Sequence, residues 1–160
     1  MKSDNPLKHF VVAFAIALVF YAVAYQAIEH RRVRKGPWQV TFTEGPGGHP
    51  LVRIDQPTLG ITNVQLHFPD DRASLTNAVR ALDFATPRPV PYEVPFGRCV
   101  FMDTTFLPGT VTLQFFGHEI ELLPRVLILD HREHPWRVNE QIELRSLPVP
   151  SIPQRPSVNQ

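Results

Sequence analysis

Two hydrophobic patterns of different kinds divide the chain near residue 36. The first is a run of 19 residues, 10–28, that carries no charge and a single amide, Gln26. An α-helix rises about 1.5 Å per residue, so about 20 apolar residues cross a hydrocarbon layer of about 30 Å. The pattern predicts a transmembrane helix over residues 10–28, preceded by an N-terminal tail over residues 1–9.

A cleaved signal peptide is the alternative interpretation of the same run. Lys2 and Lys8 would form its basic region, residues 10–21 its apolar region, and Ala22-Val23-Ala24 its cleavage site. The apolar pattern, however, continues beyond this site to Ile28 and gives a segment of spanning length. We therefore favour a retained anchor.

A basic juxtamembrane segment, residues 29–36, follows the apolar run. Tyr21 and Tyr25, near the same end, are predicted to lie at the membrane–water interface. The basic residues of the segment are predicted to lie among anionic headgroups, where each charge contributes about 1 kcal/mol; they are Arg31, Arg32, Arg34 and Lys35. Their excess over the basic residues on the N-terminal side favours a cytoplasmic body over a periplasmic or extracellular one, although long domains can be translocated regardless of charge.

The second pattern begins at Trp38, where apolar and polar residues alternate. Trp38, Val40 and Phe42 share one face of a predicted strand, and the residues between them are polar. Gly36-Pro37 ends the helix just before it. Similar patterns predict further strands, one of them fully buried, over residues 51–55, 61–68, 125–130 and 136–147.

A β-hairpin is predicted within residues 111–122. Gly117-His118 suits a two-residue turn, which would place Phe115 opposite Ile120 and leave His118 exposed. One face of the hairpin would then be wholly apolar. Its members are Val111, Leu113, Phe115, Ile120 and Leu122.

Two segments depart from the alternating pattern. Within residues 69–84, Leu75, Ala78 or Val79, and Leu82 have helical spacing, which predicts one short helix packed on a sheet. Its candidate caps are Asp70, Asp71 and Ser74. Residues 85–97 contain four prolines, which disfavour ladder pairing and predict a loop or edge segment that could serve as a partner surface.

These elements predict a mainly β fold, with a small β-sandwich or partly open barrel over residues 37–146. The chain contains 17 prolines, 16 of them after residue 35, which agrees with short strands joined by turns. The tail over residues 147–160 is polar and proline-rich and is predicted to be disordered or to wrap around a neighbour.

The charge of the body argues against nucleic-acid binding. From Gly36 onward the sequence has 10 arginines and 13 acidic residues, a balance of −3. A nucleic-acid-binding domain ordinarily shows a basic face. No phosphate-binding loop or dinucleotide-binding motif occurs in the sequence.

Histidine and cysteine provide the remaining candidate chemistry. His118, His131 and His134 are weak candidates for metal ligands, because the last two are three residues apart rather than four and lie close to Pro135. We expect a solvated turn there and no cofactor. The single cysteine, Cys99, excludes an intramolecular disulfide and is expected to be buried rather than nucleophilic.

The leading functional hypothesis is an interaction, scaffolding or accessory subunit of a membrane complex rather than an enzyme. Its expected partners are the lipid bilayer and a membrane protein or a second copy of the chain, with Ala13 and Ala17 as a small-residue helix contact. The alternatives are binding of a lipid or other apolar ligand by the β-domain and, third, a metal-dependent hydrolase.

Overall fold

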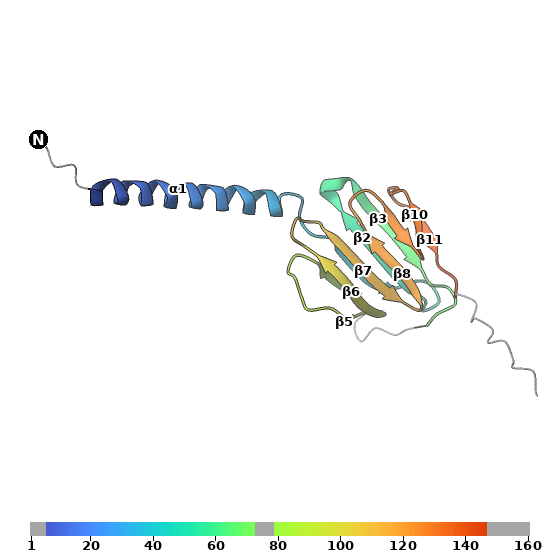
Figure 1. The fold of residues 1–160 in the computed structure, drawn as a ribbon. Coiled ribbons are helices and arrows are strands. Elements are labelled where there is room, and N and C mark those ends of the chain that lie inside the picture. Colours follow the sequence, from blue (N-terminus) through green and yellow to red (C-terminus); the bar gives the residue numbers. More distant parts are fainter. Residues whose placement is uncertain (1–5, 73–78, 147–160) are drawn as a thin grey trace, which may run out of the picture.

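A computed structural model describes residues 6–72 and 79–146 of the chain. One long helix, α1 (Pro6–Val33), projects from a body made of β-strands (Figure 1). None of its residues is buried against the body, and the helix is long and apolar enough to cross a membrane. The predicted helix is therefore present and extends beyond residues 10–28 at both ends.

The first sheet has five strands in the order β11-β3-β2-β1-β4. Its strands are β1 (Gln39–Glu44), β2 (Pro50–Gln56), β3 (Ile61–His67), β4 (Val79–Asp83) and β11 (Gln141–Glu143). Neighbouring strands are antiparallel except β11, which runs parallel to β3. A short 3-10 helix, η1 (Pro57–Leu59), connects β2 to β3.

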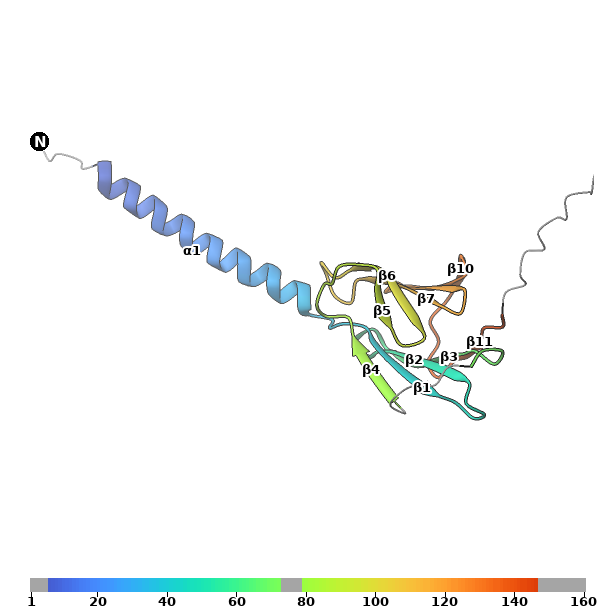
Figure 2. The ribbon, with the colours of Figure 1, turned by 90° about the horizontal axis from the view of Figure 1, so that it is seen from below.

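The second sheet has six antiparallel strands in the order β10-β9-β8-β7-β6-β5. Its strands are β5 (Tyr92–Val94), β6 (Gly97–Asp103), β7 (Thr110–Phe115), β8 (His118–Leu122), β9 (Leu127–Leu129) and β10 (Arg132–His134). Figure 2 shows that the two sheets form separate layers and do not close into a barrel. The predicted mainly β, sandwich-like fold is confirmed.

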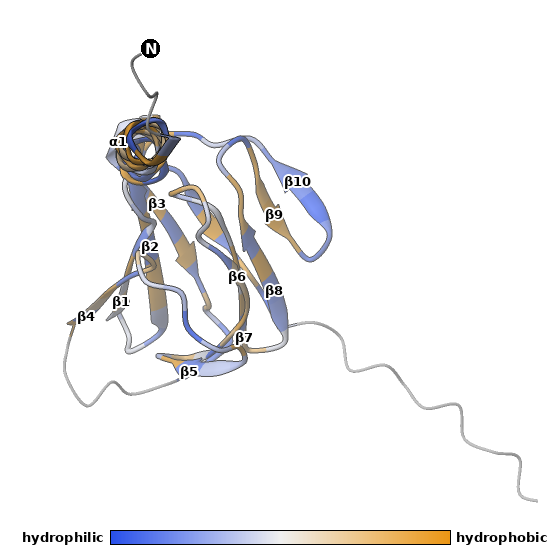
Figure 3. Ribbon diagram, turned by 60° about the vertical axis from the view of Figure 1, so that its left-hand side comes forward, coloured by the Kyte–Doolittle hydropathy of each residue, from blue (hydrophilic) through white to orange (hydrophobic). Residues whose placement is uncertain are grey.

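The core lies between the two sheets and is built from alternate strand positions. Hydrophobic and hydrophilic bands follow one another along strands such as β3 and β8 (Figure 3). Phe42 and Phe115, from opposite sheets, are fully buried and meet edge to face with ring centroids 5.7 Å apart. Val52 and Leu113 are buried beside them. The apolar residues at alternate positions of the strands thus form one continuous core between the sheets.

The helix predicted within residues 69–84 is wrong for residues 79–83, which form the edge strand β4. Leu82 pairs with Val40 of β1 and packs partly against the core, whereas Val79 is 60% exposed. Pairing with β4 satisfies the backbone groups along the second side of β1, and this tertiary gain outweighs helical spacing. Residues 73–78, including the candidate cap Ser74, lie outside the described residues.

The predicted β7–β8 hairpin exists, but its turn lies one residue earlier. Phe116 and Gly117 both have positive φ (51° and 88°), and Phe115 pairs with His118 rather than with Ile120. A turn with two positive φ values follows the natural strand twist. The change shifts pairing by two residues, so both faces keep their side chains. The predicted apolar face is confirmed, but His118 becomes a strand residue.

The proline-rich segment is irregular over residues 85–91 and forms β5 thereafter. The predicted lack of ladder pairing is therefore wrong for Tyr92–Val94, which pair with β6. Proline is tolerated here because β5 is an edge strand with one side free of ladder bonds.

Candidate functional site

The junction between α1 and the body has no flexible linker. The N–H of Gly36 donates to the Val33 carbonyl (3.0 Å), and its φ of +71° ends the helix in a left-handed residue. The N–H of Leu107, in the β6–β7 loop, donates to the Arg32 carbonyl (2.9 Å). The second sheet thereby satisfies a carbonyl that the helix terminus leaves without an intrahelical partner.

Gln56 fixes the connecting residues from the other sheet. This residue ends β2 and is 1% exposed. Its side-chain amide donates to the carbonyls of Lys35 (3.1 Å), Gly36 (2.9 Å) and Pro37 (2.9 Å). Its own carbonyl accepts from the N–H of Thr58 at 3.1 Å. One buried side chain therefore holds three consecutive backbone carbonyls, which defines the chain path between helix and β1.

Trp38 completes the junction between the two sheets. It is fully buried, and its Nε1 donates to the Gly109 carbonyl at 3.1 Å. Its ring lies 5.3 Å from that of Trp136, whose Nε1 donates to the Leu123 carbonyl at 2.9 Å. Buried indoles with satisfied N–H groups are strongly position-specific. We call these hydrogen bonds of Gln56, Trp38 and Leu107, which connect the helix end and residues 35–38 to the two sheets, the junction.

The predicted membrane-interface residues lie on the last turns of α1 and just beyond it. Tyr21 and Tyr25 stack with ring centroids 6.4 Å apart on the exposed helix. Arg32 forms a partly exposed ion pair with Glu29 (3.0 Å), and such pairs contribute little by themselves. The other three basic residues are exposed; they are Arg31, Arg34 and Lys35. Their contact with lipid remains a prediction.

His118 is buried at the far end of the same sandwich, so its predicted exposure in a turn is wrong. It is 2% exposed, and its Nδ1 lies 2.6 Å from Asp130 Oδ2. Asp130 Oδ1 accepts from the N–H of Glu119 at 2.9 Å, and the His118 ring lies 6.1 Å from that of Phe68. The burial follows from the hairpin register, which turns residue 118 toward the core.

The His118–Asp130 pair resembles the base and the orienting carboxylate of a catalytic triad, but no nucleophile of the described residues is bonded to it. His118 Nε2 is buried and forms no hydrogen bond within the described part of the chain. Acyl transfer needs a nucleophilic hydroxyl or thiol in contact with that nitrogen. The pair instead connects the start of β8 to the β9–β10 turn, whose central residues Asp130 and His131 both have positive φ.

The three candidate metal ligands are not brought together. The His131 side chain is 82% exposed in the β9–β10 turn and lies 3.9 Å from Glu119, as expected of a solvated turn. His134 ends β10 and is half-buried, so the predicted turn is wrong for residues 132–134, which form a strand paired with β9. Across residues 6–72 and 79–146, no group of three histidine, cysteine or acidic side chains is arranged to hold a metal ion. The geometry therefore does not favour the metal-site interpretation.

A row of polar side chains crosses the outer face of the second sheet. Glu93, Arg98, Gln114 and Glu119 lie opposite one another on β5 to β8. Arg98 Nε donates to Gln114 Oε1 (3.0 Å), and Gln114 Nε2 donates to Glu119 Oε2 (3.3 Å). We call these four residues the polar row. The register of four strands creates it, and no local sequence signal predicts it.

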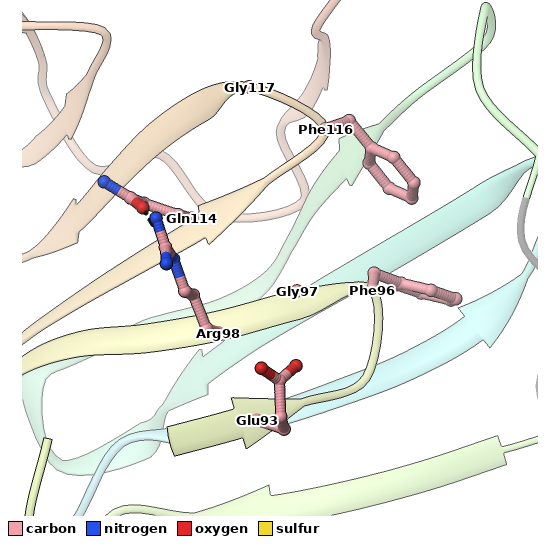
Figure 4. A pocket seen from close by; sticks show the side chains of 7 residues that line it. All are labelled: Glu93, Phe96, Gly97, Arg98, Gln114, Phe116 and Gly117. Atoms are coloured by element: carbon pink, nitrogen blue, oxygen red, sulfur yellow. Dashed lines mark hydrogen bonds between the residues drawn. The ribbon is translucent and has the colours of Figure 1, made fainter. Parts of the chain in front are cut away.

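A shallow hollow of about 340 Å³ lies over the polar row, with Phe96 and Phe116 at one end (Figure 4). The two aromatic rings are 6.0 Å apart and half-buried. This volume is at the low end for small-molecule pockets, and the rings also pack on the core, Phe96 on Phe42 and Phe116 on Phe68. Arginine and phenylalanine are both enriched at the centre of protein interfaces. The hollow is thus better suited to a protein surface than to a cofactor.

Cys99 behaves as a core residue, as expected. It is fully buried on β6, and its Sγ contacts the Phe101 carbonyl at 3.4 Å. Burial raises the pKa of the Cys99 thiol, which disfavours the reactive thiolate. Burial likewise raises the pKa of Tyr92, which lies opposite Cys99 on β5.

The structure therefore offers two features with functional potential: the junction at one end of the sandwich and the polar row on its outer face. The histidine cluster offers neither an open metal site nor a nucleophile in the described residues. Comparison of this chain with protein-family models, with curated proteins and with solved structures finds no match.

Proposed function

We propose that the chain is a single-pass membrane protein whose β-sandwich is an interaction or accessory subunit of a membrane complex. The observation that carries the proposal is the junction, in which Gln56 and Leu107 bond the helix end and the connecting residues directly to the body. A body held in this way cannot move far from the bilayer. Such a geometry suits contacts with the exposed domain of a neighbouring membrane protein, because the binding surface is preorganised.

The surface that fits a protein partner best is the polar row with its aromatic end. Arg98 and the rings of Phe96 and Phe116 are the residue types enriched in interface centres. The hollow on the outer face of the first sheet is lined instead by Thr41, Thr43, Leu51, Arg53, Gln65 and Val79. It lacks aromatic rings, so it provides a matched comparison surface.

Purification of the full chain from its native membranes in mild detergent, after brief crosslinking, tests this proposal. We expect an integral membrane protein to accompany the chain, and we expect Arg98→Glu to reduce its recovery at least about tenfold, as loss of an interface hot spot does. Arg53→Glu is the control, because Arg53 is also an exposed strand arginine bonded to one neighbour, Asp55 at 2.9 Å. Recovery of the chain alone as a monomer would contradict the proposal. So would an equal decrease in partner recovery with Arg98→Glu and Arg53→Glu.

The body is proposed to lie in the cytoplasm, supported by the basic residues that follow the membrane-spanning segment. A thiol reagent that does not cross membranes should then modify a Val79→Cys variant in inverted vesicles but not in intact cells. Val79 suits the purpose because its side chain is 60% exposed. Modification in intact cells would place the body outside.

The two alternative functions lack a supporting observation. Phe68 and Phe115 lie 6.3 Å apart with perpendicular rings, and Phe42 packs on the same Phe115, so aromatic side chains fill this part of the space between the sheets. An apolar ligand would need that space. A metal-dependent hydrolase would need a ligand set that the described residues do not assemble. Pairing of α1 with a second copy remains a prediction that the purification also tests.

A further inference from the structure

The β6–β7 loop carries an exposed aromatic residue beside the end of α1. Phe106 is 60% exposed and is the most exposed aromatic side chain of the described body. Its neighbour Leu107 is only 8% exposed and bonds through its N–H to the Arg32 carbonyl. Figures 1 and 2 show the loop that joins β6 to β7 beside the C-terminal end of α1. The exposure of Phe106 is therefore located at the helix end.

Hydrogen bonds attach the loop at both ends and in its centre. Asp103 Oδ1 accepts from the N–H of Thr105 at 3.0 Å, and hydrogen bonds from Thr105 lower the pKa of the Asp103 carboxyl. The Gly109 carbonyl accepts from the buried Trp38. Leu107 completes the attachment through Arg32. A loop fixed at both ends and in its centre presents the Phe106 ring outward.

Helix geometry gives the position of the β6–β7 loop relative to the bilayer, if α1 spans the membrane as proposed above. Arg32 lies four positions after Ile28, the last residue of the apolar run, which is about 6 Å along the helix axis. Each headgroup layer is about 5–7 Å thick, since the full bilayer of about 40–45 Å contains a hydrocarbon core of about 30 Å. The Arg32 carbonyl and the Leu107 N–H bonded to it thus lie at headgroup level.

We propose that the β6–β7 loop, residues 104–109, is a second membrane contact, with the Phe106 ring inserted among the lipid headgroups and upper acyl chains of the bilayer that α1 spans. Aromatic side chains are favoured at this level. The basic residues Arg31, Arg34 and Lys35 surround the same end of the helix and favour anionic lipid there. Together, helix and loop fix the tilt of the sandwich against the membrane.

Fluorescence quenching in reconstituted vesicles tests the proposal with the full chain. Single cysteines replace Phe106, Val79 and Ala17 in turn, and each is labelled with an environment-sensitive fluorophore; buried Cys99 serves as the unlabelled background in the parent protein. The vesicles contain phosphatidylcholine and phosphatidylserine with a nitroxide either near the headgroup or deep in the acyl chain. Val79 is the matched control, because it is also 60% exposed but pairs with Thr43, at the end of β1 far from the helix.

We expect the shallow nitroxide to quench the label at residue 106 at least about twofold more than the label at residue 79, and the deep nitroxide to quench the label at residue 17 most. Quenching at residue 17 but equal, low quenching at residues 106 and 79 would overturn the loop contact while leaving the anchor intact. Absence of quenching at residue 17 would overturn the anchor itself and the loop contact with it. A label at residue 106 shielded from both aqueous iodide and lipid nitroxide would place a second copy of the chain there and also overturn the proposal.

Discussion

Replacement of Gln56 by leucine is expected to lower the free energy of unfolding of the body by about 3 kcal/mol, because buried carbonyls lose their donor. The amide of Gln56 serves Lys35, Gly36 and Pro37, and leucine of similar size can bond none of them. Denaturant titration in detergent, followed by tryptophan fluorescence, measures the change. Trp38 is part of the junction and Trp136 packs against it, so their fluorescence reports on this region.

Gln114→Leu is the matched control for this prediction. Gln114 is likewise a glutamine with side-chain hydrogen bonds, to Arg98 and Glu119, but it lies on the solvent-facing side of the second sheet. Its loss leaves groups that water can solvate, so the expected decrease is about 1 kcal/mol or less. Equal destabilisation by both variants would mean that the burial of Gln56 adds nothing to the stability that its hydrogen bonds provide.

Gly109→Ala is expected to cause the second large loss of stability, about 4 kcal/mol, because a Cβ there has no space. An added Cβ would lie 1.8 Å from the Asp103 carbonyl oxygen, and the backbone has a φ of +69°. The Gly109 carbonyl also accepts from Trp38, so any displacement of this residue disturbs the junction. Thermal and denaturant unfolding of the purified variant measure the loss.

Gly60→Ala separates the two causes of that loss. Gly60 has nearly the same φ, +73°, but an added Cβ would meet no atom within 4 Å. Only the backbone conformation then disfavours alanine, by about 1 kcal/mol. A Gly109→Ala variant as stable as Gly60→Ala would show that the β6–β7 loop relaxes easily, and it would weaken the argument that this loop holds Phe106 in place.

The sequence predicts those parts of the fold that depend on local periodicity. The apolar run locates α1, although the helix extends beyond it at both ends, and alternation from Trp38 onward defines the faces of β1, β2, β3, β7 and β8. The apolar face of the hairpin is correct even though the turn is misplaced, because a shift of two residues preserves the side-chain alternation. These results follow from geometry within one or two elements.

The remaining features depend on contacts between distant residues. Leu82 has helical spacing in the sequence, but pairing with Val40 of β1 determines its conformation. Local sequence predicts His118 as a turn residue, but the strand register places it opposite Phe115. Short apolar segments leave helix and strand ambiguous, and turn type determines register. The choice between helix and strand for residues 79–83, and the choice of turn type for the hairpin, therefore depend on contacts outside these segments.

The features of the candidate functional site were the least predictable. Gln56 is the last residue of an ordinary strand. No feature of the neighbouring sequence indicates that its side chain bonds the carbonyl of Gly36, 20 residues earlier. Leu107 and Arg32 are 75 positions apart, yet one hydrogen bond joins them. The polar row needs the register of four strands before its members become neighbours. Such long-range pairings are properties of the fold rather than of a motif.

The central claim is that the body is held in one orientation relative to α1. The most direct test is pulsed electron–electron double resonance, which measures the distance between two spin labels. The labels are attached at Ala22→Cys on the helix and Val79→Cys on β4, in the full chain reconstituted in lipid nanodiscs. Both positions are exposed, and Cys99 is fully buried. The account predicts a single narrow distance distribution that broadens in the Gln56→Leu variant. A broad distribution in the unaltered junction would contradict it.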